Sequence, residues 1–213
     1  ELPPFARGEL PPPFDAAFGL AEGAVSDALP SRCGFHLFKV LKKTPAAAGV
    51  PAEAAAEARR APHFAKAGGP FPPPCLALLG SKAEKRLEVW AGVAPDGPWR
   101  HIRDYPILAA SGRPGPKLRE GDGQVPEGVY RVERLNPQSK YHLSLRLDYP
   151  NAFDRAKAAQ EGRTDPGCDI YIHGGAVSIG CLAMGDEAVE ELFVLAARIV
   201  FPYFRVMLAP ADL

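Results

Sequence analysis

Short apolar segments separated by closely spaced turn residues make up the chain from residue 82 onward, and this pattern restricts the possible folds more than any other feature. Turn signals such as "PDGP", "SGRPGP", "GDGQVPEG" and "NPQS" recur between the segments. Short strands punctuated in this way favour a mainly antiparallel sandwich or barrel to which helices are added. The expected strands are 86–91, 99–110 with a break near Pro106, 128–135, 141–147, 169–174 and 203–208.

Two helices are expected among these strands. The shorter one covers 152–160. The stronger pattern covers 186–199, where five apolar residues recur on one helical face: Val189, Leu192, Phe193, Ala196 and Ile199. Asp186 is the expected N-cap of this helix, because its carboxylate can accept hydrogen bonds from the first free amides. The sequence therefore predicts an α+β fold that is mainly β.

Residues 1–80 are expected to form an N-terminal extension packed on a main domain of residues 81–213. Proline accounts for 24 of the 213 residues, about twice its usual share of roughly 5%. The extension has too few large apolar residues for a core of its own. Its expected elements are a Pro-rich arm, helices at 14–29 and 51–60, a strand at 35–41 and an irregular segment at 67–74.

Composition argues against two classes of partner. The formal net charge is zero, so nothing in the charge supports binding to nucleic acid. No segment reaches the ~20 consecutive apolar residues of a membrane-spanning helix. The four cysteines include no CxxC pair, so there is no starting point for a zinc ribbon or a thioredoxin-type site, and the cysteines allow two disulfides, one or none.

The stretch "IYIHGGAVSIGCLAMGDEAVEELF" (170–193) combines residues suited to thiol chemistry. A nucleophilic cysteine needs a base, a group that orients the base, and backbone amides facing the developing oxyanion. His173 ends an apolar strand, the Gly174 carbonyl can accept its second ring N–H, and Gly180 lets amides converge beside Cys181. A following helix that begins close to Cys181 would lower the thiol pKa. The competing interpretation is a buried, inert thiol beside a structural histidine.

Two motifs in this order carry a family resemblance. "IHGG…SIGC" resembles the active-site signature of L,D-transpeptidase (YkuD-type) catalytic domains, and "VPEGVYRV" (125–132) resembles that family's strand entry upstream of it. The wider run from Tyr105 to Ala156 is similar to the YafK-like branch in particular. The resemblance covers about 84–209 and leaves residues 1–80 unexplained.

The resemblance implies a β-sandwich fold and specific roles. Cys181 would be the nucleophile, His173 the base, the Gly174 carbonyl the group that orients the imidazole, and the Gly180 and Cys181 amides the oxyanion donors. The family forms a thioacyl-enzyme on a peptidoglycan stem tetrapeptide and passes the acyl group to an amine or to water. Two positions depart from the usual pattern: Ile179 replaces a histidine, and Ala183 replaces an arginine.

Further residues are assigned to substrate binding, each with a structural alternative. Ser178 belongs to the motif itself. Tyr141 and His142 would line the cleft or form a surface pair across strands. Lys117, with Arg119, would bind an acidic stem or belong to an exposed charged loop. No metal and no cofactor are expected, because the spacing of the cysteines and histidines fits no common zinc pattern.

The function expected from the resemblance is that of a cysteine-dependent L,D-transpeptidase in the periplasm or cell envelope. The alternatives are a hydrolase of the same fold, which trims stems or releases wall-linked protein, and a catalytically silent wall-binding module. The chain begins at Glu1 with no methionine and no leader, so an exported protein would have lost one or carry none in this sequence. In an oxidising envelope Cys33 and Cys75 are the first choice for a disulfide.

Overall fold

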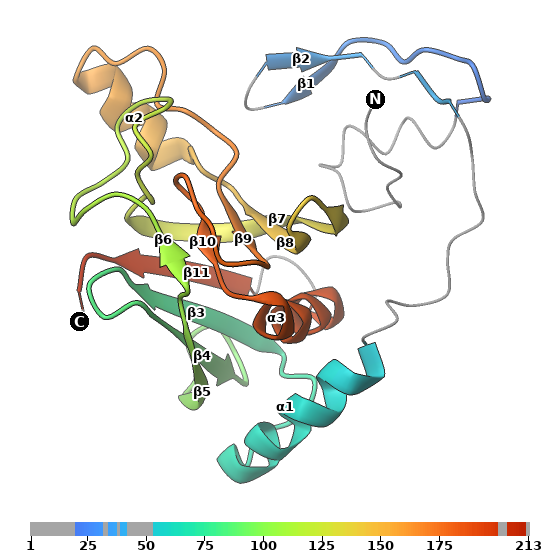
Figure 1. Cartoon of the computed structure of the whole chain (residues 1–213), viewed down its shortest axis with the longest axis vertical. Helices are drawn as coiled ribbons and strands as arrows, with labels where there is room; N and C mark the ends of the chain where they lie inside the picture. Colours follow the sequence, from blue (N-terminus) through green and yellow to red (C-terminus); the bar gives the residue numbers. More distant parts are fainter. Residues whose placement is uncertain (1–19, 32–33, 38, 42–52, 200–203, 212–213) are drawn as a thin grey trace.

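Nine strands of the described chain form one continuous sheet in the order β5-β4-β3-β11-β7-β8-β9-β10-β6. The computed structural model describes residues 20–31, 34–37, 39–41, 53–199 and 204–211 (Figure 1). The strands of this sheet are β3 (Cys75–Ser81), β4 (Arg86–Gly92), β5 (Trp99–Pro106), β6 (Ala109–Ala110), β7 (Gly128–Ser139), β8 (His142–Leu147), β9 (Tyr171–His173), β10 (Leu182–Ala183) and β11 (Phe204–Ala209). A separate hairpin joins β1 (Leu29–Ser31) to β2 (Gly34–His36).

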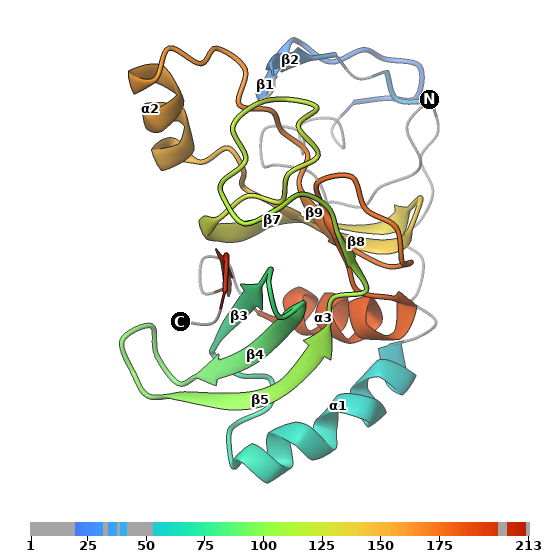
Figure 2. The same cartoon turned by 60° about the vertical axis from the view of Figure 1, so that its left-hand side comes forward.

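The long strand β7 divides the sheet into two halves. Its first part pairs with β11, from Gly128 to Arg131, and its second part pairs with β8. Strands β5 and β6 are consecutive in the chain and lie at opposite ends of the strand order, so the sheet folds back on itself. Figure 2 shows the half containing β3, β4 and β5 opposite the half containing β7, β8 and β9. The mainly β, α+β class is therefore confirmed.

Alternating burial explains the strands of the first half. In β4 the side chains of Leu87, Val89 and Ala91 are buried, while the positions between and before them are partly exposed. This is the period-two pattern of a strand with one face in a core. The opposing strand β8 is buried at every position after His142. Helix α3 (Asp186–Arg198) packs on β7, β8 and β9 and supplies the cover on that side.

The five apolar residues expected on one face of α3, Val189, Leu192, Phe193, Ala196 and Ile199, are all buried, as predicted. Helix α2 (Ala152–Gln160) is confirmed and begins with a capping box between Asn151 and Asp154. The predicted N-cap of α3 is wrong: the cap is Gly185, with φ +79°, and Asp186 is the first helical residue. The Asp186 carboxylate accepts instead from the Gly175 amide, at 2.8 Å.

The N-terminal region differs from the expectation in several places. Helix α1 runs over Glu53–Ala67, longer than predicted, because Arg60 and Phe64 bury their side chains beyond the Ala-rich segment. The described part of the expected helix at 14–29 contains turns, a bridge and β1 but no helix. The expected strand at 35–41 is reduced to β2 and a bridge at Lys39, and residues 1–19 lie outside the described residues.

The structure adds a central strand that the pattern did not indicate. Strand β3 lies between β4 and β11, pairing antiparallel with the first and parallel with the second. Its sequence, "CLALLGS", follows a Pro-rich segment and does not alternate in polarity, so it carries no period-two signal. Helix α1, just before it, packs against α3 (Figures 1 and 2). The division of the chain at residue 80 stays a prediction.

No helix among the described residues is both long and apolar enough to span a membrane. Cys75 is a buried thiol in the described part of the chain. The predicted pairing of Cys75 with Cys33 stays a prediction, because Cys33 lies outside the described residues.

Candidate active site

Strand β9 carries His173 in the interior of the second half of the sheet. The residue pairs with Ser144 of β8 on one side and with Ala183 of β10 on the other. Only 4% of its surface is exposed. A rigid ladder on both sides thus fixes the backbone beneath the imidazole.

Cys181 lies on the same face of the sheet as His173. Strands β9 and β10 are parallel, with Ile172 opposite Leu182 and His173 opposite Ala183. Cys181 is two residues before Ala183, and side chains two residues apart point to the same face. Two residues of rise and one interstrand spacing place the two Cα atoms about 8 Å apart. An imidazole and a thiol can approach each other across such a diagonal.

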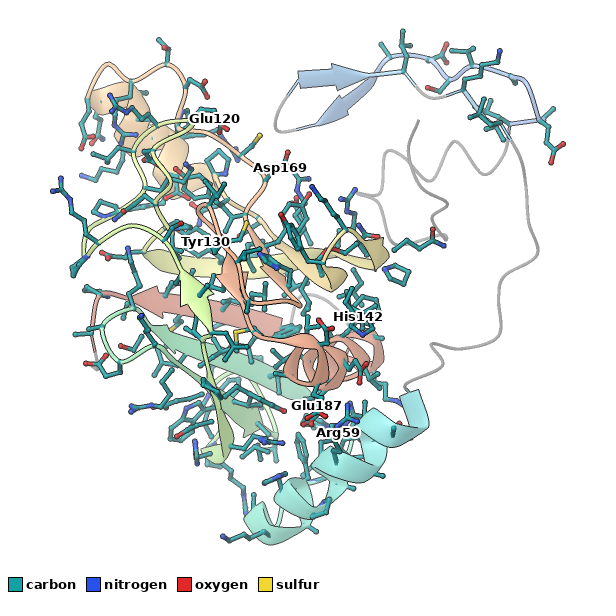
Figure 3. The ribbon with its side chains drawn as sticks, in the orientation of Figure 1. Arg59, Glu120, Tyr130, His142, Asp169 and Glu187 are labelled. Carbon is teal, nitrogen blue, oxygen red and sulfur yellow. The ribbon has the colours of Figure 1, made fainter. Side chains whose placement is uncertain are left out.

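The thiol points elsewhere in the resting structure. It donates to the Asp169 carbonyl across 3.8 Å, and the described contacts include no hydrogen bond between Cys181 and His173. Asp169 is labelled in Figure 3. Rotation about the Cα–Cβ bond of the cysteine redirects the sulfur without moving the backbone. Catalytic hydrogen bonds are often formed only once substrate is bound.

The hydrogen bonds of His173 define its tautomer. Nδ1 lies 2.7 Å from the Gly174 carbonyl oxygen, and a carbonyl can only accept, so Nδ1 carries the proton and Nε2 keeps its lone pair. The ring of Tyr141 stacks on the imidazole, with 4.7 Å between centroids and 29° between planes. Burial lowers the pKa of His173, against a smaller opposite effect of the Gly174 hydrogen bond. The histidine is therefore neutral at neutral pH and able to accept a proton on Nε2.

The two glycines after His173 are required by space and by backbone conformation. A Cβ atom at Gly174 would lie 2.6 Å from Asp186 Oδ1 and 2.6 Å from the Tyr141 carbonyl oxygen. Gly175 has φ +69°, in the left-handed region that favours glycine. The segment is thus enclosed between α3 and the β7–β8 turn, which brings Tyr141 over the imidazole.

The thiol of Cys181 is not activated by α3. Burial raises its pKa, and the negative charge of Asp169 adds to this, while a backbone hydrogen bond and the charge of Lys117 act in the opposite direction. The helix begins five residues later, at Asp186, and the field of a helix end falls off within its first turn. The expected lowering of the pKa is therefore wrong, and the thiol needs a base.

Serine hydroxyls occupy both expected oxyanion donors. The Gly180 amide donates to Ser111 Oγ, and the Cys181 amide donates to Ser178 Oγ at 3.0 Å. Ser178 also donates to the Cys181 carbonyl, at 2.6 Å, and so closes the turn around the cysteine. Sequence reasoning missed Ser111, whose only signal is its position directly after β6, the strand that pairs with β10.

Comparison with known proteins places this arrangement in a family. Residues 79–199, more than half of the chain, match the L,D-transpeptidase catalytic domain (YkuD). The chain belongs to this family. It is 38% identical over 114 residues to YafK of Escherichia coli (strain K12), which is named as a candidate L,D-transpeptidase; the aligned part is 53% of this chain and 43% of YafK.

A solved structure supports the same conclusion. The helical cell shape determining protein Pgp2 from Campylobacter jejuni has a TM-score of 0.52 at 26% identity, over 65% of this chain and 49% of Pgp2. A point mutant of Pgp2 gives a TM-score of 0.53 at 24% identity, over 77% of this chain and 58% of the mutant chain, and shows the fold alone. The chain spans less than half of the length of YafK and about half of that of Pgp2. The L,D-transpeptidase-like fold is thereby confirmed.

The two departures from the family pattern occupy very different places. Ile179 is 89% exposed at the tip of the loop between β9 and β10. Ala183 is fully buried in the ladder beside His173. Neither position can bind a substrate carboxylate in this chain.

The structure separates the remaining substrate-binding candidates. Tyr141 is 39% exposed and covers the imidazole, at the site. His142 turns away, with Nε2 2.9 Å from Glu190 Oε1 of α3. Lys117 is buried rather than part of an exposed charged loop, and its ammonium donates to Asp122 at 2.7 Å and to the Arg119 carbonyl at 2.9 Å. No cluster of metal-ligating side chains occurs in the described part of the chain.

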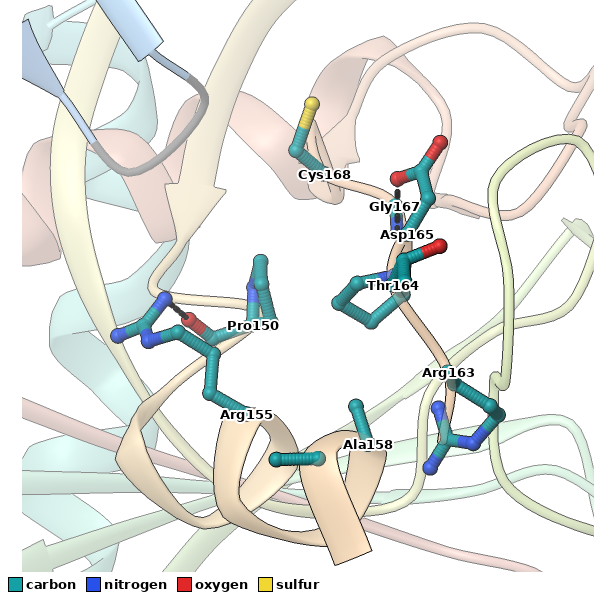
Figure 4. A pocket seen from close by; sticks show the side chains of 10 residues that line it. Pro150, Arg155, Ala158, Arg163, Thr164, Asp165, Gly167 and Cys168 are labelled. Carbon is teal, nitrogen blue, oxygen red and sulfur yellow. Dashed lines mark hydrogen bonds between the residues drawn. The ribbon is translucent and has the colours of Figure 1, made fainter. Parts of the chain in front are cut away.

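A pocket of about 470 Å³ lies between α2 and the segment that leads to β9 (Figure 4). Arg155 and Arg163 line it on opposite sides, and Asp165 and Cys168 belong to the same lining. Cys181 does not line it. Cys168 directly precedes Asp169, whose carbonyl accepts from the Cys181 thiol, so the lining of the pocket is adjacent in the chain to a contact of Cys181.

Proposed function

We propose that the chain is a cysteine-dependent enzyme of the L,D-transpeptidase type that acts on peptidoglycan stem peptides in the periplasm or cell envelope. The observation that carries this proposal is the pair formed by His173 and Cys181. The two side chains share one face of the β9–β10 pair, and the tautomer of His173 leaves Nε2 free to take a proton. Membership of the family supplies the reaction class.

The first half of the reaction acylates the cysteine. Nε2 of His173 takes the thiol proton as sulfur attacks the carbonyl carbon at the L-centre of the stem. The resulting tetrahedral intermediate then expels the amine of the terminal D-residue, which receives that proton from the imidazolium. A thioester on Cys181 and a free D-amino acid are the products of this half.

The second half transfers the acyl group to an acceptor. An amine attacks the thioester, His173 removes its proton, and the cysteine leaves as a thiolate that recovers the proton from the imidazolium. A new amide bond results. If water attacks instead, the product is a stem with a free carboxylate. When the amine expelled in the first half belongs to an attached protein rather than to a D-residue, that protein is released from the wall at that earlier step.

The amides of Gly180 and Cys181 would stabilise the tetrahedral oxyanion. Their hydrogen bonds to Ser111 and Ser178 would be exchanged for bonds to that oxygen, because an anionic acceptor binds an amide more strongly than a hydroxyl does. Ser178, one of these two serines, therefore acts here by shaping the turn.

Substrate anchoring falls to groups other than Ala183. Tyr141 offers an aromatic face beside the imidazole. In the neighbouring pocket, Arg155 donates to the Pro150 carbonyl and Arg163 is paired with Glu161. A guanidinium has five N–H donors, so the carboxylates of an acidic stem would bind the N–H groups that these bonds leave over. The ammonium of Lys117 and the ring of His142 already have partners on the protein, so their contribution to binding is through the loops that they hold.

A covalent adduct tests the proposal. We expect a carbapenem to add its mass to the intact chain, and Cys181→Ala to abolish the adduct. Cys168→Ala is the matched control, because Cys168 is a second partly exposed thiol near the pocket, and it should leave the adduct unchanged. An adduct that persists in Cys181→Ala would refute the assignment of the nucleophile.

Two outcomes with sacculi separate the remaining readings. New crosslinks or exchanged D-amino acids indicate transfer, whereas stems that are only shortened, or released wall-linked protein, indicate the hydrolase. Binding to sacculi without turnover, combined with an unreactive Cys181, would identify a silent wall-binding module.

A further inference from the structure

A line of side-chain contacts runs from helix α1 to the candidate catalytic histidine, although α1 lies outside the residues that match the family. It begins at Arg59, whose Nη2 donates to Glu190 Oε2 at 2.7 Å and whose Nε donates to Glu191 Oε1 at 3.0 Å. Both glutamates belong to α3. Arg59 and His142, two members of this line, are labelled in Figure 3.

The second contact joins α3 to the turn between β7 and β8. The other oxygen of Glu190 lies 2.9 Å from Nε2 of His142. His142 has φ +71°, an uncommon conformation for a residue other than glycine. The preceding residue is Tyr141, whose ring stacks on His173.

We propose that Glu190 is a positioning residue for the candidate catalytic base. Held by Arg59 on one oxygen, it holds His142 with the other and thereby keeps the Tyr141 ring on His173. Helix α1 is in this view a part of the active-site architecture rather than a decoration of the family domain. A catalytic role of His173 rests on the proposed function. The stacking of Tyr141 on His173 is a property of the structure and does not depend on that function.

Besides the strand pairing of Ser139 with His142, few described contacts hold the turn over the imidazole. The Tyr141 amide donates to Ser139 Oγ at 3.2 Å, a contact within the turn itself. Tyr141 is 39% exposed, and the His142 side chain is 40% exposed. Among the side-chain contacts of Tyr141 and His142 given by the structure, the Glu190 bond is the one that ties this turn to a helix.

The surroundings of His173 make its titration a direct measure of this cover. Strand β8 presents the uncharged Ser144, β10 presents Ala183, and the loop before β10 presents the thiol of Cys181. From α3, the carboxylate of Asp186 is bonded to the Gly175 amide, two residues after His173. The turn contributes the Tyr141 ring, with Lys140 Nζ 5.8 Å above it, and His142. Burial dominates the pKa of His173, so loss of the tyrosine cover should raise it.

The test compares Glu190→Ala with Glu187→Ala in the full chain. Glu187 is exposed and lies about one helical turn before Glu190 on α3 (Figure 3). Its replacement by alanine therefore removes the same charge without removing a contact to the β7–β8 turn. His142→Asn cuts the same link from the other side, with a shorter side chain that tolerates positive φ. The titration of His173 is followed by NMR of its Cε1–H, assigned as the signal lost in His173→Gln.

We expect Glu190→Ala and His142→Asn to raise the pKa of His173 and to reduce the ring-current shift of its Cε1–H, and Glu187→Ala to change neither. Acylation of Cys181 should slow by about tenfold in Glu190→Ala and His142→Asn. Removal of the base itself costs more, about 100-fold or greater in rate. Titration of His173 at the wild-type pH in both Glu190→Ala and His142→Asn would overturn the proposal. Failure of the wild-type chain to acylate would count against the proposed function, while the titration would still decide the role of Glu190.

Discussion

Substitution of Gly174 by alanine should disable the active site while leaving the fold in place. The added Cβ would lie 2.6 Å from Asp186 Oδ1 and 2.6 Å from the Tyr141 carbonyl oxygen. Ordinary contacts begin at 3.4 Å, so each neighbour must yield by 3.4 − 2.6, or about 0.8 Å. Since both neighbours press on the new methyl group, a shift of the backbone away from one does not relieve the other.

The cost follows from these distances. Overpacking of this kind destabilises a folded protein by about 1–3 kcal/mol, which a domain of ordinary stability survives. The Gly174 carbonyl orients the imidazole through a 2.7 Å bond, and a misplacement of about 1 Å costs about 100-fold in rate. We therefore expect acylation of Cys181 to slow by about 100-fold, or about 2.7 kcal/mol in activation free energy.

The assay measures the rate of carbapenem adduct formation by intact mass, together with thermal unfolding of the same samples. Gly69→Ala is the matched control, because a Cβ there would meet its nearest neighbour at 3.9 Å, an ordinary contact. It should acylate at the wild-type rate. Wild-type kinetics in Gly174→Ala with an unchanged melting temperature would refute the reasoning that links this glycine to the position of the histidine.

Three further predictions concern pH and stability. Because burial lowers the pKa of His173, the acid limb of Cys181 acylation should lie below the ordinary histidine value of 6.5; a limb at or above that value in a rate–pH profile would contradict this. Glu191→Gln should lower the free energy of unfolding by about 2–4 kcal/mol in urea titrations, since the buried carboxylate accepts from Tyr105 at 2.6 Å and from two arginines, and a loss below about 1 kcal/mol would show that these bonds add little. Burial alone would raise the pKa of Asp122, but Lys117 and three backbone amides hold it at about 2. The contribution of this carboxylate to stability is therefore present above pH 3.8 and is lost toward pH 2. The melting temperatures of wild type and Asp122→Asn should converge over that interval.

Strands and helices whose apolar residues recur at a regular spacing could be predicted from the sequence. The alternation in 86–91 and the helical face beginning at Val189 reflect burial of one side only, and the structure shows both. Strand β3 gave no such signal because its partly exposed positions, Ala77 and Leu79, are also apolar, so burial alternates along the strand while polarity does not. The candidate residues Cys181 and His173 could be selected from the sequence because their motif lies within one short stretch of the chain.

Other features depend on partners that are remote in sequence. Ser111 is 69 residues from Gly180, with which it bonds, and Glu190 is 131 residues from Arg59. Lys117 looked like part of a solvated loop because its partner Asp122 gives no signal of burial in the sequence. The cap of α3 was misassigned because Asp186 serves the Gly175 amide, a contact that exists only once the loop and helix have packed.

Burial acts in opposite directions on the two groups that carry the proposed chemistry. It lowers the pKa of His173 and raises the pKa of Cys181, because it disfavours the charged form of each. The resting pair is therefore a neutral imidazole and a neutral thiol, not a thiolate–imidazolium pair formed in advance. In the proposed reaction, proton transfer would then accompany attack on the substrate, at the moment when the oxyanion gains its amide donors. This explains why the positions of Gly174 and Tyr141 matter: a base that acts only in the transition state depends on its orientation more than on its charge.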